Sequence, residues 1–423
     1  MSETSVLENF AHGALPEEHT VPGWRVALIV ASFTFALPGF LNCAQTALAL
    51  GFWPAVGAAA LAGLILCGGA CLTAVISVRT RLTTYLLVQR SFGVRGAALV
   101  NLVIAVIHFC WFGVNVSFFG DAMVAAAGGG YGIKGDFATF VMIGSALITV
   151  STIFGFRTLD RLAMVAVPLV GVVLVVICLT VLPHHPLELS PAAHPPVPMS
   201  FGIALSALVG GNMLTVATMP DLSRYIRSER GALTGMALIF PIAAPLLMIV
   251  SALIALATGQ TDIMKLVVAL GFGVPALVLL VLSVWTINAL NLYSAGLSAA
   301  ATFPRVPQWA LTVIGGMAGC ALAIAGIITT FIPFLVTLGL IIPPIAAVYV
   351  IDGLRTFAHQ DPAFDAAAVP AFRWEAIAVW LGSLAITMPA TAWGYTLTTV
   401  PALDASILAA LAYLAILSIR RPR

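Results

Sequence analysis

Long apolar runs alternate with short polar segments along most of the chain. Each run holds about 20 residues, which is enough for an α-helix to cross the hydrocarbon core of a bilayer. The pattern predicts an all-α integral membrane protein with about twelve transmembrane helices. The expected spans are residues 25–49, 54–78, 98–126, 137–156, 162–182, 200–219, 234–258, 274–302, 309–328, 330–351, 375–394 and 401–418.

Composition agrees with this pattern. Only 8% of the residues are charged and 61% are hydrophobic, whereas a soluble domain carries about 25% charged residues. The formal net charge of +2 makes nucleic-acid binding a poor fit. Residues 1–24 are polar and acidic, without the basic start and apolar core of a signal peptide. We expect them to form a short, poorly ordered cytoplasmic tail.

The basic residues are distributed unevenly between the two sides of this topology. Of the 18 lysines and arginines, only Lys134 and Lys265 fall in the odd-numbered loops. All others lie in the even-numbered loops or near the two termini. Because basic residues concentrate on the cytoplasmic side, we expect a multi-pass protein of the cell inner membrane with both termini in the cytoplasm. A miscount by one span would destroy the segregation, so it also supports the count.

Two apolar runs contain residues that can interrupt a helix, Pro38-Gly39 in the first and Gly210-Gly211-Asn212 in the sixth. Many transporters bind substrate and ions at such interruptions, where freed backbone groups line a cavity. The placement predicts broken helices 1 and 6. The alternative is that these residues have no function beyond packing, since glycine and proline are common in membrane helices.

The first and sixth spans each begin a block of five helices. This arrangement predicts a five-plus-five inverted repeat, with residues 25–182 and 200–351 as its halves. Together they would form a transport core over residues 25–351. Residues 375–423 would add two peripheral helices and a basic C-terminal tail.

Polar residues at membrane depth are few, and they cluster on three spans. Such residues are costly in a bilayer and are therefore candidates for a binding site. Those on the third span follow one another at spacings of three and four, so they share a helix face. The set is His108, Trp111 and Asn115 on the third span, Asn212 on the sixth, and Thr286, Asn288 and Asn291 on the eighth.

This set favours a neutral, amide-lined pocket with an aromatic wall. A planar heterocycle would stack on the indole, and its edge would pair with amide donors and acceptors. No arginine is expected there to bind a carboxylate, and no carboxylate pair to bind an amine. The alternative is that these amides and hydroxyls only link neighbouring helices.

Several short motifs, in order along the chain, resemble the nucleobase–cation symporter family, also called the purine/cytosine permease family. Each motif is modest alone, but their order is specific. The motifs are Leu82–Leu87, Ser91–Gly96, Trp111–Val114, Pro220–Tyr225, Trp285–Asn288 and Thr302–Val306.

The resemblance implies a five-plus-five repeat with two extra helices and a substrate held near mid-membrane between spans 1, 3, 6 and 8. Trp111 matches the family's stacking tryptophan, and Gly211 matches a residue that offers its backbone to substrate. Asn115 falls where some members have a glutamine facing the substrate. Asn291, with Asn288 nearby, falls near an asparagine that pairs with the ring edge.

Two residues depart from the family pattern. Asn212 stands where relatives have a second aromatic wall, so one face of the pocket would be polar, and a substrate other than cytosine stays open as an alternative. Ile287 stands where sodium-coupled relatives have a threonine hydroxyl that binds the ion. The remaining candidate cation ligands are the carbonyls of Ser32, Phe35 and Ser283 and the hydroxyl of Thr286.

These four oxygens leave the coupling ion open between Na⁺ and H⁺. For proton coupling, the candidate carriers are His108 and Asp121. Apart from a possible sodium ion, we expect no metal and no cofactor.

The sequence therefore predicts a secondary active transporter that imports cytosine or a related pyrimidine or purine by cation symport. The main alternative keeps the fold but changes the solute to allantoin, hydantoin or a vitamin precursor, with proton coupling as an option. An intramembrane enzyme is disfavoured because HExxH and GxSxG motifs are absent at membrane depth. A passive channel is disfavoured because the chain has no repeated filter loop.

Overall fold

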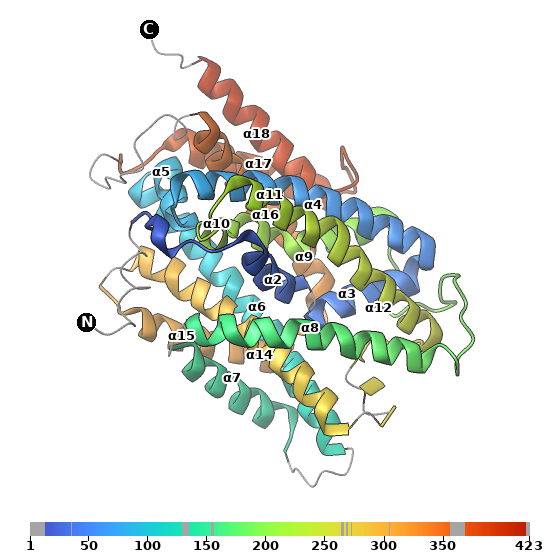
Figure 1. The fold of residues 1–423 in the computed structure, drawn as a ribbon. Coiled ribbons are helices and arrows are strands. Elements are labelled where there is room, and N and C mark those ends of the chain that lie inside the picture. Colours follow the sequence, from blue (N-terminus) through green and yellow to red (C-terminus); the bar gives the residue numbers. More distant parts are fainter. Residues whose placement is uncertain are drawn as a thin grey trace.

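The computed structural model describes residues 13–34, 36–128, 135–153, 156–263, 266–267, 270–271, 273–303, 305–355 and 369–419. In this part of the chain the structure is helical, apart from a single β-bridge between Val21 and Ile226. The helices pack into one bundle (Figure 1). They are η1 (Glu17–His19), α2 (Gly23–Thr34), α3 (Leu37–Leu50), α4 (Phe52–Thr80), α5 (Thr84–Phe92), α6 (Val94–Gly128), α7 (Phe137–Ile153), α8 (Phe156–Val181), α9 (Phe201–Ala217), α10 (Met219–Ser223), α11 (Glu229–Leu238), η2 (Ile239–Ala243), α12 (Ala244–Thr258), α14 (Gly273–Thr302), α15 (Gln308–Ile324), η3 (Ile327–Thr330), α16 (Phe331–Arg355), α17 (Trp374–Ala392) and α18 (Pro401–Ile419).

A helix, or a pair of consecutive helices, occupies each of the twelve ranges expected from the sequence. Within the described ranges, six helices are long and apolar enough to cross a membrane, and four shorter apolar helices accompany them. The uncertain boundary between the ninth and tenth spans falls at Gly326, whose φ of 84° ends α15. Such a left-handed glycine is a common helix terminator. The count of twelve membrane crossings and the inverted repeat stay predictions.

The first span is broken, as the sequence indicates. α2 ends at Thr34, and α3 begins at Leu37 with Pro38 in its first turn. Proline has no N–H, and its ring collides with the carbonyl four residues earlier, so it is tolerated in a first turn but not in a helix interior. The break therefore lies just before Pro38 and leaves backbone groups at the end of α2 without a continuing helix.

The sixth span corrects the expectation of a break at Gly210-Gly211-Asn212. α9 runs without interruption through these residues to Ala217, and only Thr218 separates it from α10, which begins at Met219. The glycines have a packing role. A Cβ on Gly210 would collide with the backbone carbonyl of Leu335 in α16. The missing side chain lets α9 and α16 approach closely, as small residues do in membrane bundles.

The N-terminal segment is also more ordered than expected, from residue 13 onward. The backbone N–H of Leu15 donates to the carbonyl of Arg81 at 3.1 Å. Val21 and Ile226 form the β-bridge, in which the N–H of Val21 donates to the carbonyl of Tyr225 at 2.7 Å. This segment therefore pairs with the loop that follows α10.

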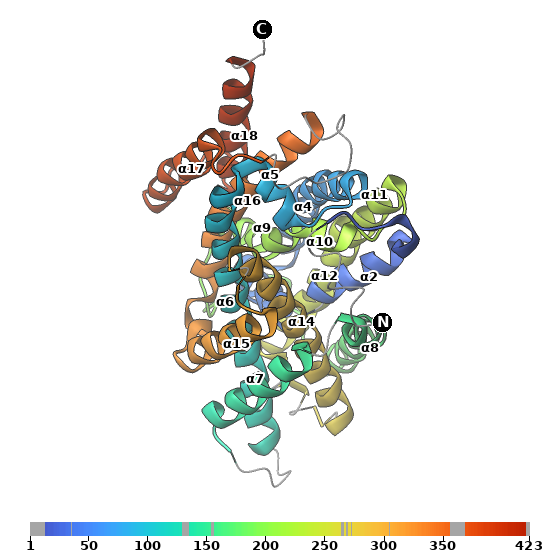
Figure 2. The ribbon, with the colours of Figure 1, turned by 90° about the vertical axis from the view of Figure 1, so that its left-hand side faces the viewer.

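The last two helices, α17 and α18, lie along one edge of the bundle beside α16 (Figures 1 and 2). A buried polar group joins them to it. Arg373 donates to Asp352 of α16 at 2.7 Å, and the hydroxyl of Tyr413 in α18 donates to the other oxygen of Asp352 at 2.9 Å. Because both oxygens are paired, the buried carboxylate is tolerated.

Candidate functional site

A cavity lies among the broken first span and five other helices of the bundle. Its volume is about 80 Å³, several times the 10–15 Å³ or so that a single water needs. Its walls come from the start of α3, from α6, α9 and α10, from α14 and from the start of α16. The described residues that line it include Pro38, Gly39, Asn42, His108, Trp111, Gly211, Asn212, Thr215, Asp221, Arg224, Tyr225, Ile287, Asn291, Tyr293, Ser294, Phe331 and Leu335.

Trp111 forms an aromatic wall of this cavity. Its ring meets Phe331 edge to face, with centroids 6.3 Å apart, and Phe334 at 5.5 Å. Such edge contacts are favourable between aromatic rings. They fix the indole plane, and only 8% of the residue remains exposed.

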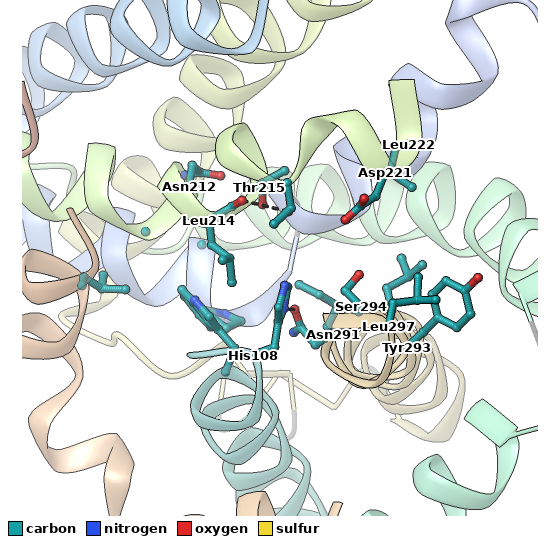
Figure 3. A pocket seen from close by; sticks show the side chains of 18 of the residues that line it. His108, Asn212, Leu214, Thr215, Asp221, Leu222, Asn291, Tyr293, Ser294 and Leu297 are labelled. Atoms are coloured by element: carbon teal, nitrogen blue, oxygen red, sulfur yellow. Dashed lines mark hydrogen bonds between the residues drawn. The ribbon is translucent and has the colours of Figure 1, made fainter. Parts of the chain in front are cut away.

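His108 and Asn291 meet at the cavity wall, although they are 183 positions apart in the sequence. Nδ1 of His108 lies 3.3 Å from Oδ1 of Asn291. Figure 3 shows the two side chains facing Asn212, Leu214 and Thr215 of α9 across the cavity. Both residues of the pair are at least 96% buried, at 3% and 4% exposed. The third and eighth spans thus place an imidazole and an amide at one point.

The α9 wall carries Gly211 and Asn212. A Cβ on Gly211 would lie in ordinary contact with Leu335 and Asn42, so the backbone here is close to both neighbouring helices. Asn212 is half-buried, and its Nδ2 donates to the carbonyl of Leu208 at 3.3 Å, within its own helix. Among the described residues no hydrogen bond to its Oδ1 is found.

Two expected substrate-binding residues do not line the cavity. The amide of Asn115 is fully buried and turns back to the carbonyl of Trp111, to which it donates at 2.9 Å. Asn288 is fully buried, and neither atom of its amide finds a hydrogen-bond partner among the described residues. The structure brings together Trp111, Gly211, Asn212 and Asn291, and it leaves Asn115 and Asn288 in the packed interior.

The structure describes only some of the expected cation ligands. Phe35 lies outside the described residues, and for Ser32 and Ser283 the structure gives the helical backbone but not the side chain. Thr286 is buried in α14, and the neighbouring Ile287 lines the cavity. Ile287, which stands where sodium-coupled relatives have a threonine, therefore places an apolar side chain at the cavity wall.

The α10 end of the cavity carries groups that the polar-residue pattern missed. Asp221 lies there with Ser294 and Leu297 (Figure 3). Burial raises the pKa of the Asp221 carboxyl, while the N–H of Thr84 and the charge of Arg224 oppose this effect. Asp221 lies just past the sixth apolar run, so the pattern of polar residues within the apolar runs does not include it. Asp121, the acidic candidate of the third span, is exposed and does not line the cavity.

Comparisons with known proteins agree with this geometry. Over residues 29–415 the chain matches the sequence profile of a family described as permeases for cytosine/purines, uracil, thiamine and allantoin. It is 29% identical over 380 residues to the cytosine permease of Escherichia coli strain K12, and the match covers 88% of each chain. The cytosine permease of E. coli O157:H7 matches at the same identity and coverage.

Solved structures show the same fold. Mhp1, a nucleobase-cation-symport-1 family transporter in a closed conformation with bromovinylhydantoin bound, superposes with a TM-score of 0.77 at 18% identity, over 97% of this chain and 95% of that one. A Na⁺-coupled sialic acid symporter superposes with a TM-score of 0.67 at 14% identity, over 95% and 90%.

The fold and the cavity define a multi-pass, all-helical membrane transporter, not an enzyme. The chain belongs to the family of permeases for cytosine/purines, uracil, thiamine and allantoin, the nucleobase–cation symporters. Members of this family are secondary transporters of nucleobase-like solutes, and this is the function class of the chain.

Proposed function

We propose that this protein imports cytosine or a related pyrimidine or purine by cation symport. It would lie in the cell inner membrane with both termini in the cytoplasm. The observation that carries the proposal is the cavity, which joins Trp111 of the third span to Asn291 of the eighth beside the broken first span. A planar base would stack on the indole and pair its edge with the amide. The name of the E. coli relatives supports cytosine as the first solute to test.

Alternating access would use the same elements. The broken first span and the α9–α10 turn can close over a bound solute, and the cavity at present extends along α10 as far as Asp221 and Tyr225. Substrate contacts on α3, α6, α9 and α14 would favour closure, and reorientation would then open the other side. Trp111, Gly211, Asn212 and Asn291 are the proposed substrate contacts.

The coupling ion is the second part of the proposal. Ser32, Phe35, Ser283 and Thr286 would supply oxygens to Na⁺, a hard cation that prefers such ligands. The apolar Ile287 at the cavity wall removes one hydroxyl from this set. Proton coupling is the competing version, and of the two carriers named from the sequence only His108 lines the cavity.

One observation favours the other solutes within the same class. Asn212 lines the cavity where an aromatic wall was expected, and its Oδ1 offers an acceptor. A polar wall suits a heterocycle with more hydrogen-bonding groups, such as allantoin or a hydantoin. The solved structure with bromovinylhydantoin bound shows that a protein of this fold accepts such a ring.

The test is uptake of labelled cytosine by proteoliposomes, with an inward Na⁺ gradient compared with an inward H⁺ gradient. Accumulation against the cytosine gradient under either ion supports import by symport, and the effective gradient identifies the ion. If folded protein accumulates no pyrimidine, purine, allantoin or hydantoin under either gradient, the proposal is wrong.

A further inference from the structure

His108 touches the cavity, yet its one hydrogen bond is to another side chain. Oδ1 of Asn291 can only accept a hydrogen bond, so Nδ1 of His108 must carry the proton in the 3.3 Å contact. No other hydrogen bond of Asn291 is found among the described residues. The contact therefore holds the amide in one of its two orientations, with Nδ2 left to the cavity that Asn291 lines.

An amide without such a contact can rotate and offer either its oxygen or its nitrogen to a ligand. In the structure Oδ1 faces His108, and the two residues are packed against each other with 3% and 4% of their surfaces exposed, so the Nδ1-protonated imidazole favours this orientation. Nε2 of His108 is itself buried and has no partner in the described structure. The imidazole is thus held by packing and by this single contact.

We propose that His108 is a positioning residue that fixes Asn291 as a hydrogen-bond donor and thereby selects ligands with an acceptor at that edge. The ligand class is a planar heterocycle that directs a carbonyl oxygen or an unprotonated ring nitrogen toward α14. The inference rests on the proposed function, since it concerns the same cavity. It adds a specificity determinant that does not need to touch the ligand.

The contact between the two residues predicts non-additive effects of mutation. His108→Leu frees the amide to rotate and is expected to weaken binding about 5- to 10-fold, the range in which a single oriented hydrogen bond counts. Asn291→Ala removes the donor and is expected to weaken binding by about 10- to 100-fold. If His108 acts through Asn291, adding His108→Leu to Asn291→Ala changes the affinity by less than about threefold.

The experiment measures dissociation constants for the purified full-length protein and these three variants, using whichever of cytosine, uracil and hydantoin binds the wild type most tightly. A fourth variant, Asn291→Asp, keeps an acceptor for His108 but loses the amide donor. It should bind as weakly as Asn291→Ala. Ser117→Ala is the matched control, because its hydroxyl bonds only within α6, to the carbonyl of Gly113 at 2.9 Å.

Two outcomes overturn the inference alone: wild-type affinity in His108→Leu, or losses that add fully in the double variant. Additive losses would also identify a merely structural role, which weakens binding regardless of Asn291. Should His108→Leu fail to fold, His108→Gln, whose amide N–H can still reach Asn291, replaces it and is expected to bind within about threefold of wild type. If the wild type binds none of the three solutes, nor a purine or allantoin, the proposed function fails and this inference fails with it.

Discussion

Oδ1 of Asp221, at the α10 end of the cavity, accepts a hydrogen bond of 2.8 Å from the backbone N–H of Thr84 at the start of α5. Next to it, the hydroxyl of Ser77 in α4 donates to the carbonyl of Pro220 at 2.8 Å. These two contacts join α10 to the turn between α4 and α5. The cavity wall at this end is therefore tied to the second span.

The carboxyl of Asp221 should make the fold sensitive to pH. Burial raises the pKa of this group above its ordinary value. A carboxyl whose pKa is higher in the folded than in the unfolded protein leaves stability intact below the unfolded pKa and lowers it as pH rises toward the folded pKa. We predict that Asp221→Asn, which still offers Thr84 an acceptor, raises the midpoint of thermal unfolding near neutral pH and leaves it unchanged in acid.

Thermal melts of wild type and variant across a pH series check this prediction. Asp136→Asn is the control, since Asp136 accepts the same kind of contact from the N–H of Thr139 at 2.9 Å but is exposed. Its pKa is lowered by hydrogen bonds from the side chain and the backbone N–H of Thr139, so the substitution should not raise the midpoint. A neutral-pH midpoint of Asp221→Asn at or below that of wild type would contradict the assignment.

The contact between α9 and α16 depends on Gly210. A Cβ at this position would collide with the carbonyl of Leu335, which is backbone and cannot rotate away. Gly210→Ala should therefore separate the two helices and lower stability by about 1–3 kcal/mol, the usual cost of overpacking. Thermal unfolding in detergent measures the loss.

Gly68 in α4 is the matched control for this substitution. A Cβ there would meet no atom within 4 Å, and alanine is a better helix former than glycine. Gly68→Ala should leave stability unchanged or slightly higher. Equal effects of the two substitutions would show that helix propensity, not the approach to Leu335, determines the result.

The same glycine shows where sequence reasoning stops. Span positions could be predicted because bilayer thickness sets the length of an apolar run, and the break before Pro38 follows from the covalent structure of proline. A glycine pair in a membrane helix fits either a break or a close contact. Only the position of Leu335 on another helix decides between them.

Sequence spacing also predicts only part of the arrangement of the polar residues on the third and eighth spans. The spacing of Trp111 and Asn115 places them on one helix face, yet the Asn115 amide turns to its own helix while the Trp111 ring lines the cavity. Side-chain rotation within a shared face cannot be read from spacing. His108 and Asn291 become partners only because α6 and α14 pack side by side.

The buried ion pair that joins the C-terminal helices should be far more important for stability than an exposed one. Asp352 is fully buried and paired with both Arg373 and Tyr413. Asp352→Ala leaves Arg373 with Glu375, 3.7 Å away, as its remaining carboxylate, and should cost about 3 kcal/mol, the lower end of the range for a broken buried pair. Glu229 also forms a bidentate pair, with Arg79, but both side chains are over 40% exposed.

Glu229→Ala should therefore cost no more than about 1 kcal/mol. Chemical or thermal unfolding of both variants gives the comparison. Similar losses in the two would mean that water reaches Asp352 and that the α16–α18 contact does not depend on it.

Trp111→Ala should remove the aromatic wall of the cavity without unfolding the protein. The expected loss in affinity for a planar solute is about tenfold or more, since stacking on an aromatic ring contributes about 0.5–1.5 kcal/mol beyond the buried area. Trp111→Phe should retain most of the affinity. Trp53, which is 70% exposed at the start of α4, is the control, and full uptake by a folded Trp111→Ala variant would refute the site.

Ile287 offers the most direct test of the coupling ion. It lines the cavity beside Thr286, and threonine in its place would add one hydroxyl to the proposed cation ligands. Hard cations bind more tightly as oxygen ligands are added. We predict that Ile287→Thr lowers the Na⁺ concentration needed for half-maximal uptake by roughly tenfold, which corresponds to about 1.4 kcal/mol.

Leu297→Thr is the matched control, because Leu297 lines the cavity ten residues further along α14. It adds the same hydroxyl at a position that no proposed ion ligand adjoins. Uptake into proteoliposomes at a series of Na⁺ concentrations separates the two variants. If Na⁺ dependence changes in neither variant while an H⁺ gradient still drives uptake, the oxygens around Thr286 do not bind Na⁺, and the coupling ion is the proton.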